Sequence, residues 1–378
     1  MSIWEKETFY KPVDILIVGS GLVGLWTAYE LKKRQPALSV RIIDKGDIPT
    51  GASTRNAGFA CFGSVTELLS DKEQTGEALM LEVVENRYKG IQKTRTLLGD
   101  EQIGFEACGG YEAINKYYNN YADLGEHIID LNKSLQQITA LQETFTINNQ
   151  ALQTLGLSGF NALAYSPLEG ALHSGKLVQR LTALVQQMGV SISMNKPLLQ
   201  WQQQATTITV ATPNETIQCS QLIFATNGFT QTLLPNTNVV PGRGQVLVTK
   251  PIPGLKLYGT FHYDEGFYYW RHLGNRVLLG GGRNQAFEAE ETCILETTNT
   301  IQEHLLSFLN NHILQGYNIA NTSDLIEHHW AGIMAFTKNK LPEVKAVANN
   351  VITVIACNGM GVALSSIIAE QVADKVLG

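Results

Sequence analysis

A glycine motif near the start of the chain constrains the fold more than any other feature of the sequence. Gly19-Ser20-Gly21-Leu22-Val23-Gly24 has the form GxGxxG. It follows a short β-branched run at residues 13–18 and leads into residues 22–34, where apolar residues recur at helical spacing. A second strand-like run, residues 39–44, ends in Asp44. This order predicts a βαβ unit of a Rossmann-like parallel sheet.

The glycine motif and Asp44 predict a dinucleotide site. Glycine permits a tight turn, close approach of the backbone to a pyrophosphate, and close packing of helix on strand, while the helix N-terminus offers N–H donors. A carboxylate at the end of the second strand can accept hydrogen bonds from ribose hydroxyls. The residues expected to bind the cofactor are Gly19, Ser20, Gly21, Leu22, Val23, Gly24 and Asp44. The motif alone does not separate NAD from FAD.

The loop after Asp44 is rich in glycine and hydroxyl residues, above all at residues 51–58. Its N–H and O–H groups can serve a second phosphate or a flavin ring. A plain solvated surface loop is the alternative interpretation. On the first interpretation, the loop adds to the cofactor site Lys45, Ser53, Thr54, Arg55, Asn56, Ala57 and Gly58.

Composition argues against several other classes of protein. Apolar residues make up 44% and charged residues 16% of the chain, which is typical of a globular protein. The 28 basic and 34 acidic residues give a net charge of −6, which disfavours nucleic acid as a partner. The five cysteines form no CxxC pair and the eight histidines are scattered, so we expect neither a disulfide framework nor a metal site. With no membrane-spanning run and no signal peptide in the sequence, we expect a cytoplasmic protein.

Strand and helix patterns are unevenly distributed over the rest of the chain. Residues 64–153 contain mainly polar, helix-favouring stretches, whereas three strand-like pieces between residues 244 and 280 indicate an antiparallel sheet. The chain closes with a buried-strand pattern at residues 351–356 and a helical pattern at residues 362–376. Nucleotide-type elements therefore lie at the start, middle and end, and we expect two domains interleaved in the sequence.

Several motifs, in their order along the chain, resemble one known family. They are Glu169-Gly170-Ala171-Leu172-His173, Ala225-Thr226-Asn227-Gly228, Pro241-Gly242-Arg243-Gly244-Gln245, Gly280-Gly281-Gly282-Arg283, Trp330-Ala331-Gly332 through Leu341-Pro342, and Asn358-Gly359-Met360-Gly361. Together with the two glycine-rich segments, the chain resembles over nearly its whole length the D-amino-acid-oxidase-like family of FAD-dependent oxidoreductases. That family includes glycine, sarcosine and γ-glutamylputrescine oxidases, and the last two motifs are most similar to the γ-glutamylputrescine oxidase branch.

The resemblance implies an α/β fold in which a Rossmann-like FAD-binding domain is interleaved with an antiparallel-sheet substrate domain. The expected FAD-binding domain comprises residues 1–85, 165–235 and 330–378, and the expected substrate domain comprises residues 86–164 and 236–329. Further FAD contacts implied by the resemblance are Pro197, Leu198, Ala225, Thr226, Asn227, Gly228, Gly332, Asn358, Gly359, Met360, Gly361 and Val362. A glycine turn that opens a helix presents N–H donors where reduced flavin gathers negative charge, which supports the last of these.

The resemblance also implies a substrate pocket formed by one strand and by the segment after Trp330. Its expected residues are Tyr268, Tyr269, Trp270, Arg271, Met334 and Phe336. Alternation along a strand pairs Tyr268 with Trp270 and Tyr269 with Arg271, and the sequence does not decide which pair meets the flavin. Glycine-oxidase-like members hold the substrate carboxylate with an arginine where this chain has Met334. An amine substrate is therefore favoured, unless Arg271 or Arg243 replaces that grip.

Met334 also stands where sarcosine-oxidase-like members attach the flavin through cysteine, so we expect FAD to be bound non-covalently. The lysine with which those members activate oxygen has no counterpart in residues 277–279. Oxygen and another electron acceptor therefore both stay open.

The activity implied by the resemblance is oxidation of the C–N bond of a primary or secondary amine or amino acid. A hydride passes to flavin N5, and the resulting imine hydrolyses. The alternatives are a dehydrogenase of the same fold with a non-oxygen acceptor, and a non-catalytic FAD-binding module. The flavin domain of a tRNA-modifying enzyme is disfavoured by the acidic charge.

Overall fold

The computed structural model describes residues 1–317, 319, 321–337, 341–355 and 357–378. Two sequence expectations touch the remainder: residue 356 of the predicted closing strand and residues 338–340 of the motif at 330–342 lie outside the described residues.

The chain forms two compact units, each assembled from separated segments. Unit 1 comprises Met1–Arg55, Ser174–Gly242 and Ile333–Gly378, and unit 2 comprises Asn56–His173 and Arg243–Gly332. The division differs from the expected boundaries at residues 56–85, 165–173 and 330–332, which lie in unit 2, and at residues 236–242, which lie in unit 1. The first difference arises because α4 (Val65–Thr75) packs against α5 (Glu77–Leu98), a helix that lies mostly in the expected substrate domain.

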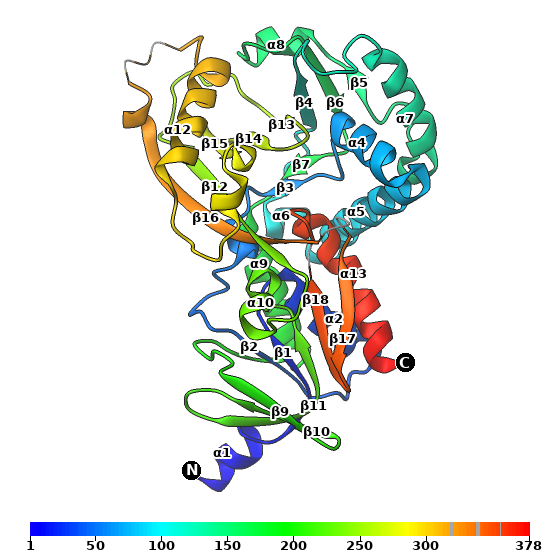
Figure 1. Ribbon diagram of the computed structural model, residues 1–378, viewed down its shortest axis with the longest axis vertical. Helices are drawn as coiled ribbons and strands as arrows, with labels where there is room; N and C mark the ends of the chain where they lie inside the picture. Colours follow the sequence, from blue (N-terminus) through cyan, green and yellow to red (C-terminus); the bar gives the residue numbers. More distant parts are fainter. Residues whose placement is uncertain (318, 320, 338–340, 356) are drawn as a thin grey trace. The chain divides into compact units, whose positions relative to one another are not determined.

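Unit 1 is built on a mostly parallel sheet with the strand order β17-β18-β11-β1-β2-β8 (Figure 1). In β1 (Val13–Val18), Val18 lies beside Ile43 of β2 (Val40–Ile43) and Phe224 of β11 (Thr216–Phe224). Strands β1 and β2 are mostly apolar and almost wholly buried, as strands covered on both faces must be. The α/β prediction is confirmed, and α2 (Leu22–Arg34) has the predicted bounds. The other elements of unit 1 are α1 (Ile3–Thr8), α3 (Ala52–Arg55), α9 (Ser174–Gln187), β8 (Ser191–Ser193), β9 (Gln200–Gln204), β10 (Thr207–Ala211), α10 (Thr230–Leu233), β17 (Glu343–Ala348), β18 (Val351–Ile355) and α13 (Gly361–Leu377).

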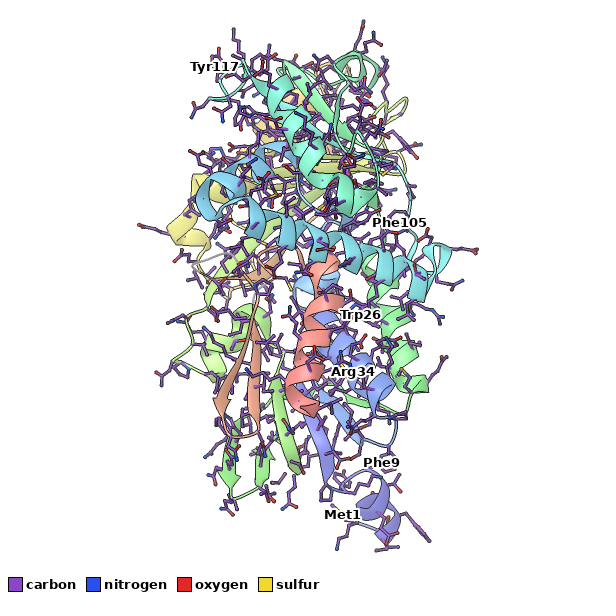
Figure 2. All side chains as sticks on the ribbon, turned by 90° about the vertical axis from the view of Figure 1, so that its right-hand side faces the viewer. Met1, Phe9, Trp26, Arg34, Phe105 and Tyr117 are labelled. Atoms are coloured by element: carbon purple, nitrogen blue, oxygen red, sulfur yellow. The ribbon has the colours of Figure 1, made fainter. Side chains whose placement is uncertain are left out.

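The two faces of this sheet are covered differently. Ile208 and Val210 of the β9–β10 hairpin pack with Leu16 and Phe224 on one face. Helices α2 and α13 pack against each other, and Figure 2 shows α13 alongside α2 with Arg34 near the end of α2. Arg34 forms a hydrogen-bonded ion pair with Asp374 of α13. This packing joins α2, the helix that follows the GxGxxG motif, to α13, the last helix of the chain.

Unit 2 contains the second sheet, whose order is β16-β12-β15-β14-β13-β4-β6-β5. All of its recorded pairings are antiparallel except that between β13 and β4, which confirms the antiparallel prediction for residues 244–280. The elements of unit 2 are β3 (Phe59–Ala60), α4, α5, α6 (Asp100–Ile103), β4 (Gly110–Ile114), α7 (Leu124–Thr139), β5 (Thr146–Ile147), α8 (Gln150–Thr154), β6 (Ala162–Ser166), β7 (Gly170–Ala171), β13 (Thr260–Tyr263), β14 (Tyr268–Leu273), β15 (Arg276–Gly281), α11 (Phe287–Glu290) and α12 (Asn299–Phe308). Strands β12 (Val240–Thr249) and β16 (Ile326–Phe336) each continue from one unit into the other. Among the described residues, no helix is both long enough and apolar enough to cross a membrane.

Candidate cofactor and substrate site

Two glycines of the motif hold α2 close to the sheet. A Cβ at Gly24 would lie 2.0 Å from the carbonyl oxygen of Gly19, so any side chain there forces α2 away from β1. Gly19 itself has φ +109°, and a Cβ there would lie 2.5 Å from the carbonyl oxygen of Ala225. Both positions therefore require glycine for steric reasons. A Cβ at Gly21 would meet only the side chain of Ser53, whose Oγ would lie 2.9 Å away. That side chain can rotate.

Polar groups surround the start of α2. The backbone N–H of Leu22 donates to Ser53 Oγ at 2.9 Å, because the N-cap residue, Gly21, has no side chain of its own. The N–H and hydroxyl of Ser20 both donate to Asp44 Oδ2 at 2.7 Å. A helix N-terminus, a backbone that admits no side chain, and a carboxylate at the end of β2 are the groups that a pyrophosphate and a ribose require. These residues fit a dinucleotide, and Val23 lies in the same first turn.

The loop predicted to extend this site is divided between the units. Ser53, Thr54 and Arg55 form α3 in unit 1, whereas Asn56, Ala57 and Gly58 belong to unit 2. Gly58 has φ +73°, and a Cβ there would lie 2.2 Å from the carbonyl oxygen of Leu172. Thr54 Oγ1 donates to the carbonyl of Pro49, so the loop is ordered by its own contacts.

Lys45 and the segment at residues 196–198 lie beside the C-terminal end of β2. Lys45 places its ammonium 3.6 Å from the ring centroid of Phe229, a cation–π contact. The backbone N–H of Lys196 donates to the carbonyl of Asp44 at 2.7 Å, which brings Pro197 and Leu198 close to this strand end. Leu198 is buried in the core beneath the hairpin.

Three distant segments meet inside unit 1. Asn227, at φ +50°, donates from Nδ2 to the carbonyl of Ile333 at 2.9 Å, and a Cβ at Gly228 would lie 2.5 Å from the carbonyl oxygen of Met334. A Cβ at Gly359 would lie 3.7 Å from Met334 Sδ. The turn after β11 and the turn before α13 therefore both pack against Met334. Sequence reasoning placed these residues in one site but did not identify Asn227 as the group that joins β11 to β16.

The turn before α13 has a strained backbone that presents the start of the helix. Asn358 has φ +44° and Gly359 has φ +87°. Asn358 Oδ1 accepts a hydrogen bond from the N–H of Thr337 at 3.1 Å, which ties the turn to the residue after Phe336. Met360 is the N-cap of α13 and makes no side-chain cap, and Gly361 and Val362 form the first turn. Ala225 and Thr226 complete the neighbouring turn, and Gly332 is buried in β16.

The structure resolves the two faces of β14 in unit 2. Tyr268 and Trp270 pack in the core, where Tyr268 stacks on Phe308 with centroids 4.6 Å apart and Trp270 is fully buried. The expectation that Tyr268 and Trp270 face a substrate is therefore corrected: they are core residues. Tyr269 lies on the opposite face with Phe59, at 5.9 Å between ring centroids. Burial raises the pKa of Tyr269 to about 12, so its phenol stays neutral at physiological pH.

Both arginines considered as carboxylate ligands already have partners in unit 2. Arg271 is buried and donates to the backbone carbonyls of Gly58 at 2.8 Å and Leu172 at 2.9 Å. Arg243 forms a bidentate pair with Glu290, with both N–O distances at 2.8 Å. These backbone and ion-pair contacts account for the presence of both arginines in their motifs. Neither arginine has to be assigned to a substrate carboxylate to explain why it is there.

A buried polar cluster on the Tyr269 face of the unit 2 sheet was missed by sequence reasoning. His262 lies opposite both Tyr269 and Glu112 in the sheet register. Glu112 accepts hydrogen bonds from the Thr66 N–H at 2.9 Å, from Ser64 Oγ at 3.0 Å and from Thr66 Oγ1. Burial raises the pKa of Glu112 to about 7, despite these hydrogen bonds. No sequence signal marks this cluster, because its members come from distant strands.

We predict that Glu112→Gln flattens the dependence of stability on pH. A folded pKa of about 7 against an ordinary value of 4.5 means that the folded state binds the extra proton. The free energy of unfolding of the native protein should therefore fall by roughly 3 kcal/mol as pH rises from 4.5 to 7. In the variant, the amide can donate to the Ser64 and Thr66 hydroxyls and does not titrate. Urea unfolding from pH 5 to 8 measures this difference, and parallel profiles for both proteins would contradict it.

Comparisons with known proteins give one family and one fold. A sequence model described as FAD dependent oxidoreductase (DAO) matches residues 14–375. The probable oxidoreductase OrdL of Haemophilus influenzae is 20% identical over 379 residues, which cover 98% of this chain and 84% of that protein.

Solved structures similar to this chain share its fold at low sequence identity. Glycine oxidase from Geobacillus kaustophilus has a TM-score of 0.76 and 20% identity, with 97% of this chain and 95% of that chain covered. L-proline dehydrogenase from P. horikoshii has a TM-score of 0.75 and 16% identity, with coverage of 97% and 94%.

Proposed function

Because the chain belongs to the DAO family of FAD-dependent oxidoreductases, we propose that it oxidises the C–N bond of a small primary or secondary amine or amino acid. Family membership makes the protein an enzyme with FAD as its cofactor. The observation that supports the proposed site most directly is the packing of Gly228 and Gly359 against Met334 in unit 1. Gly228 packs against the Met334 backbone and Gly359 against its thioether, so two turns without side chains lie at one residue, where they admit the close approach of a planar ring system.

The unit 1 residues that fit FAD fall into three groups. We propose that the glycine cradle and the start of α2 hold the pyrophosphate, that Asp44 accepts from a ribose hydroxyl, and that the turns around Asn227 and Gly359 hold the ring. When bound, FAD accepts a hydride from the substrate carbon that carries the nitrogen. The N-terminus of α13 supplies N–H donors and a positive dipole end, which stabilise negative charge beside Gly361.

The substrate-facing residues that we retain in unit 1 are Met334 and Phe336. An apolar thioether and an aromatic ring exclude water and favour the neutral form of an amine, the form that can lose a hydride. Met334 offers no charge to a carboxylate, and Arg243 and Arg271 are engaged elsewhere. These observations favour an amine over a simple α-amino acid.

We expect at least one amine from a panel of N-methyl amino acids, polyamines and γ-glutamyl amines to bleach the flavin absorbance near 450 nm under anaerobic conditions. A turnover product with a carbonyl group should accompany the bleaching, since the imine hydrolyses. If no member of the panel reduces the flavin while dithionite does, the proposed amine and amino-acid substrates are wrong. Stopped-flow reoxidation by air distinguishes an oxidase from a dehydrogenase. Rapid return of the oxidised spectrum identifies an oxidase, and slow return identifies a dehydrogenase with another electron acceptor.

We also predict that the flavin leaves the protein on denaturation. Met334 carries a sulfur that cannot form a stable thioether to the ring, and burial raises the pKa of Cys357 to about 12, which keeps that nearby thiol un-ionised and weakly nucleophilic. Acid precipitation should therefore release all the yellow colour into the supernatant. Colour that remains in the washed pellet would show a covalent bond.

A further inference from the structure

The polar cluster of unit 2 encloses a small cavity that the proposed function does not use. Its walls include Ser64, Glu112, Phe145, Ser166, Glu169 and His262, and it offers about 10 Å³ to the centre of a water-sized molecule. This is room for one group of that size. Glycine at position 110 makes the cavity possible, because a Cβ there would lie 2.0 Å from Glu169 Oε2.

Two buried polar atoms at the cavity have no hydrogen-bond partner among the described residues. They are Glu169 Oε1 and His262 Nε2. The Glu169 side chain is only 3% exposed, and its other oxygen lies 3.7 Å from His262 Nε2, too far for a good hydrogen bond. A carboxylate oxygen buried without a donor is costly, so the site is built for a ligand that donates.

The charges around the cavity favour a cation. Arg87 pairs with Glu67 at 2.9 Å, and His262 Nε2 lies 3.7 Å from Glu169 Oε2. Glu112 then has hydrogen-bond donors but no ion-pair partner among the described residues. A buried carboxylate without a cation is destabilised, and a small cation in the cavity would compensate it.

We propose that this cavity binds an ammonium nitrogen, either a free ammonium ion or the primary amino group of a larger amine. An ammonium nitrogen is close to water in size and has only donors to offer. Glu169 Oε1 and the two serine hydroxyls can accept from it, and His262 Nε2 can do so once the ring has lost its proton. The site does not depend on the proposed function, although ammonia is a product of primary-amine oxidation.

Protonation of His262 competes with this ligand. Burial opposes the charged imidazole, but Cys61 and Glu169 outweigh it and raise the pKa of His262 above its ordinary value. The other titratable groups that face His262 are Glu67, Glu112 and, opposite it in the sheet register, Tyr269. Ammonium should therefore bind more tightly at high pH, and pH 8.5 is suitable for the test.

Thermal unfolding of the FAD-loaded protein tests the site without any activity measurement. At pH 8.5 and equal ionic strength, we expect 100 mM ammonium chloride to raise the Tm by about 2 °C more than sodium chloride or tetramethylammonium chloride. Glu169→Gln should abolish this difference and Ser166→Ala should at least halve it. Glu303→Gln, the same change at an exposed position of α12, should retain it.

Methylammonium chloride distinguishes the two sources. A shift with ammonium alone identifies the free ion, and a shift with both identifies an amino group on a chain; either result supports the site. Equal Tm values in ammonium and sodium, or a full shift in Glu169→Gln, would overturn the proposal and leave a bound water only. A substrate panel that fails while the ammonium shift persists would refute the proposed function and not this site.

Discussion

Gly24→Ala is expected to abolish retention of FAD and to lower the free energy of unfolding by about 3 kcal/mol. The new methyl group would lie 2.0 Å from the carbonyl oxygen of Gly19 and 3.4 Å from Ile17 Cγ2. Ile17 lies in β1, and Gly19 directly after it is held by a hydrogen bond from its N–H to the Ile43 carbonyl, so the helix must move away from the sheet. That movement displaces the N-terminus of α2, where the pyrophosphate is expected to bind.

The measurement pairs urea unfolding with the ratio of flavin to protein absorbance after gel filtration. Gly125→Ala is the matched control, because a Cβ at this α7 position meets nothing within 4 Å. It should be neutral or slightly stabilising and should keep its flavin. Gly21→Ala should be intermediate, since Ser53 Oγ can rotate away. Normal flavin content in Gly24→Ala would show that the helix start is not the phosphate site.

The parallel sheet and the glycine cradle could be predicted because their signals are local. The β-branched run, the GxGxxG turn and the helical periodicity of residues 22–34 lie within one short segment, and each constrains its own backbone. The structure adds the reasons for each glycine: Gly19 and Gly24 face backbone carbonyls, which cannot move aside.

The faces of β14 could not be predicted because Tyr268, Tyr269 and Trp270 are all aromatic. Alternation is readable when one face is polar, and here both faces accept rings. The structure distinguishes them by packing: Tyr268 and Trp270 lie under α12, and Tyr269 shares a face with Phe59.

The polar cluster of unit 2 could not be predicted from the sequence, for a different reason. Glu112, Glu169 and His262 are adjacent only through the pairing of β4 with β13 and the path of the chain before β7. Sequence separation hides such groups, and no spacing rule links them. The partners of Arg243 and Arg271 were hidden in the same way.

Glu290→Ala is expected to lower the free energy of unfolding by about 3–5 kcal/mol, the second of the two largest effects. Glu290 is 1% exposed and accepts from Nε and Nη2 of Arg243, each at 2.8 Å, and from Nε2 of Gln245 at 3.0 Å. Removing it leaves a guanidinium buried without its counter-ion. Glu288→Ala, an exposed change in the same short helix, should alter stability by less than about 0.5 kcal/mol.

Salt and a double substitution separate this interpretation from a substrate role of Arg243. A buried pair is poorly screened, so the loss measured by urea unfolding should persist at high salt. Arg243→Met combined with Glu290→Met removes both charges and should regain most of the lost stability. If Arg243 served only the fold, this double variant would keep the KM of the native enzyme. A KM that rises for carboxylate-bearing substrates alone, with stability restored, would instead assign Arg243 to the substrate.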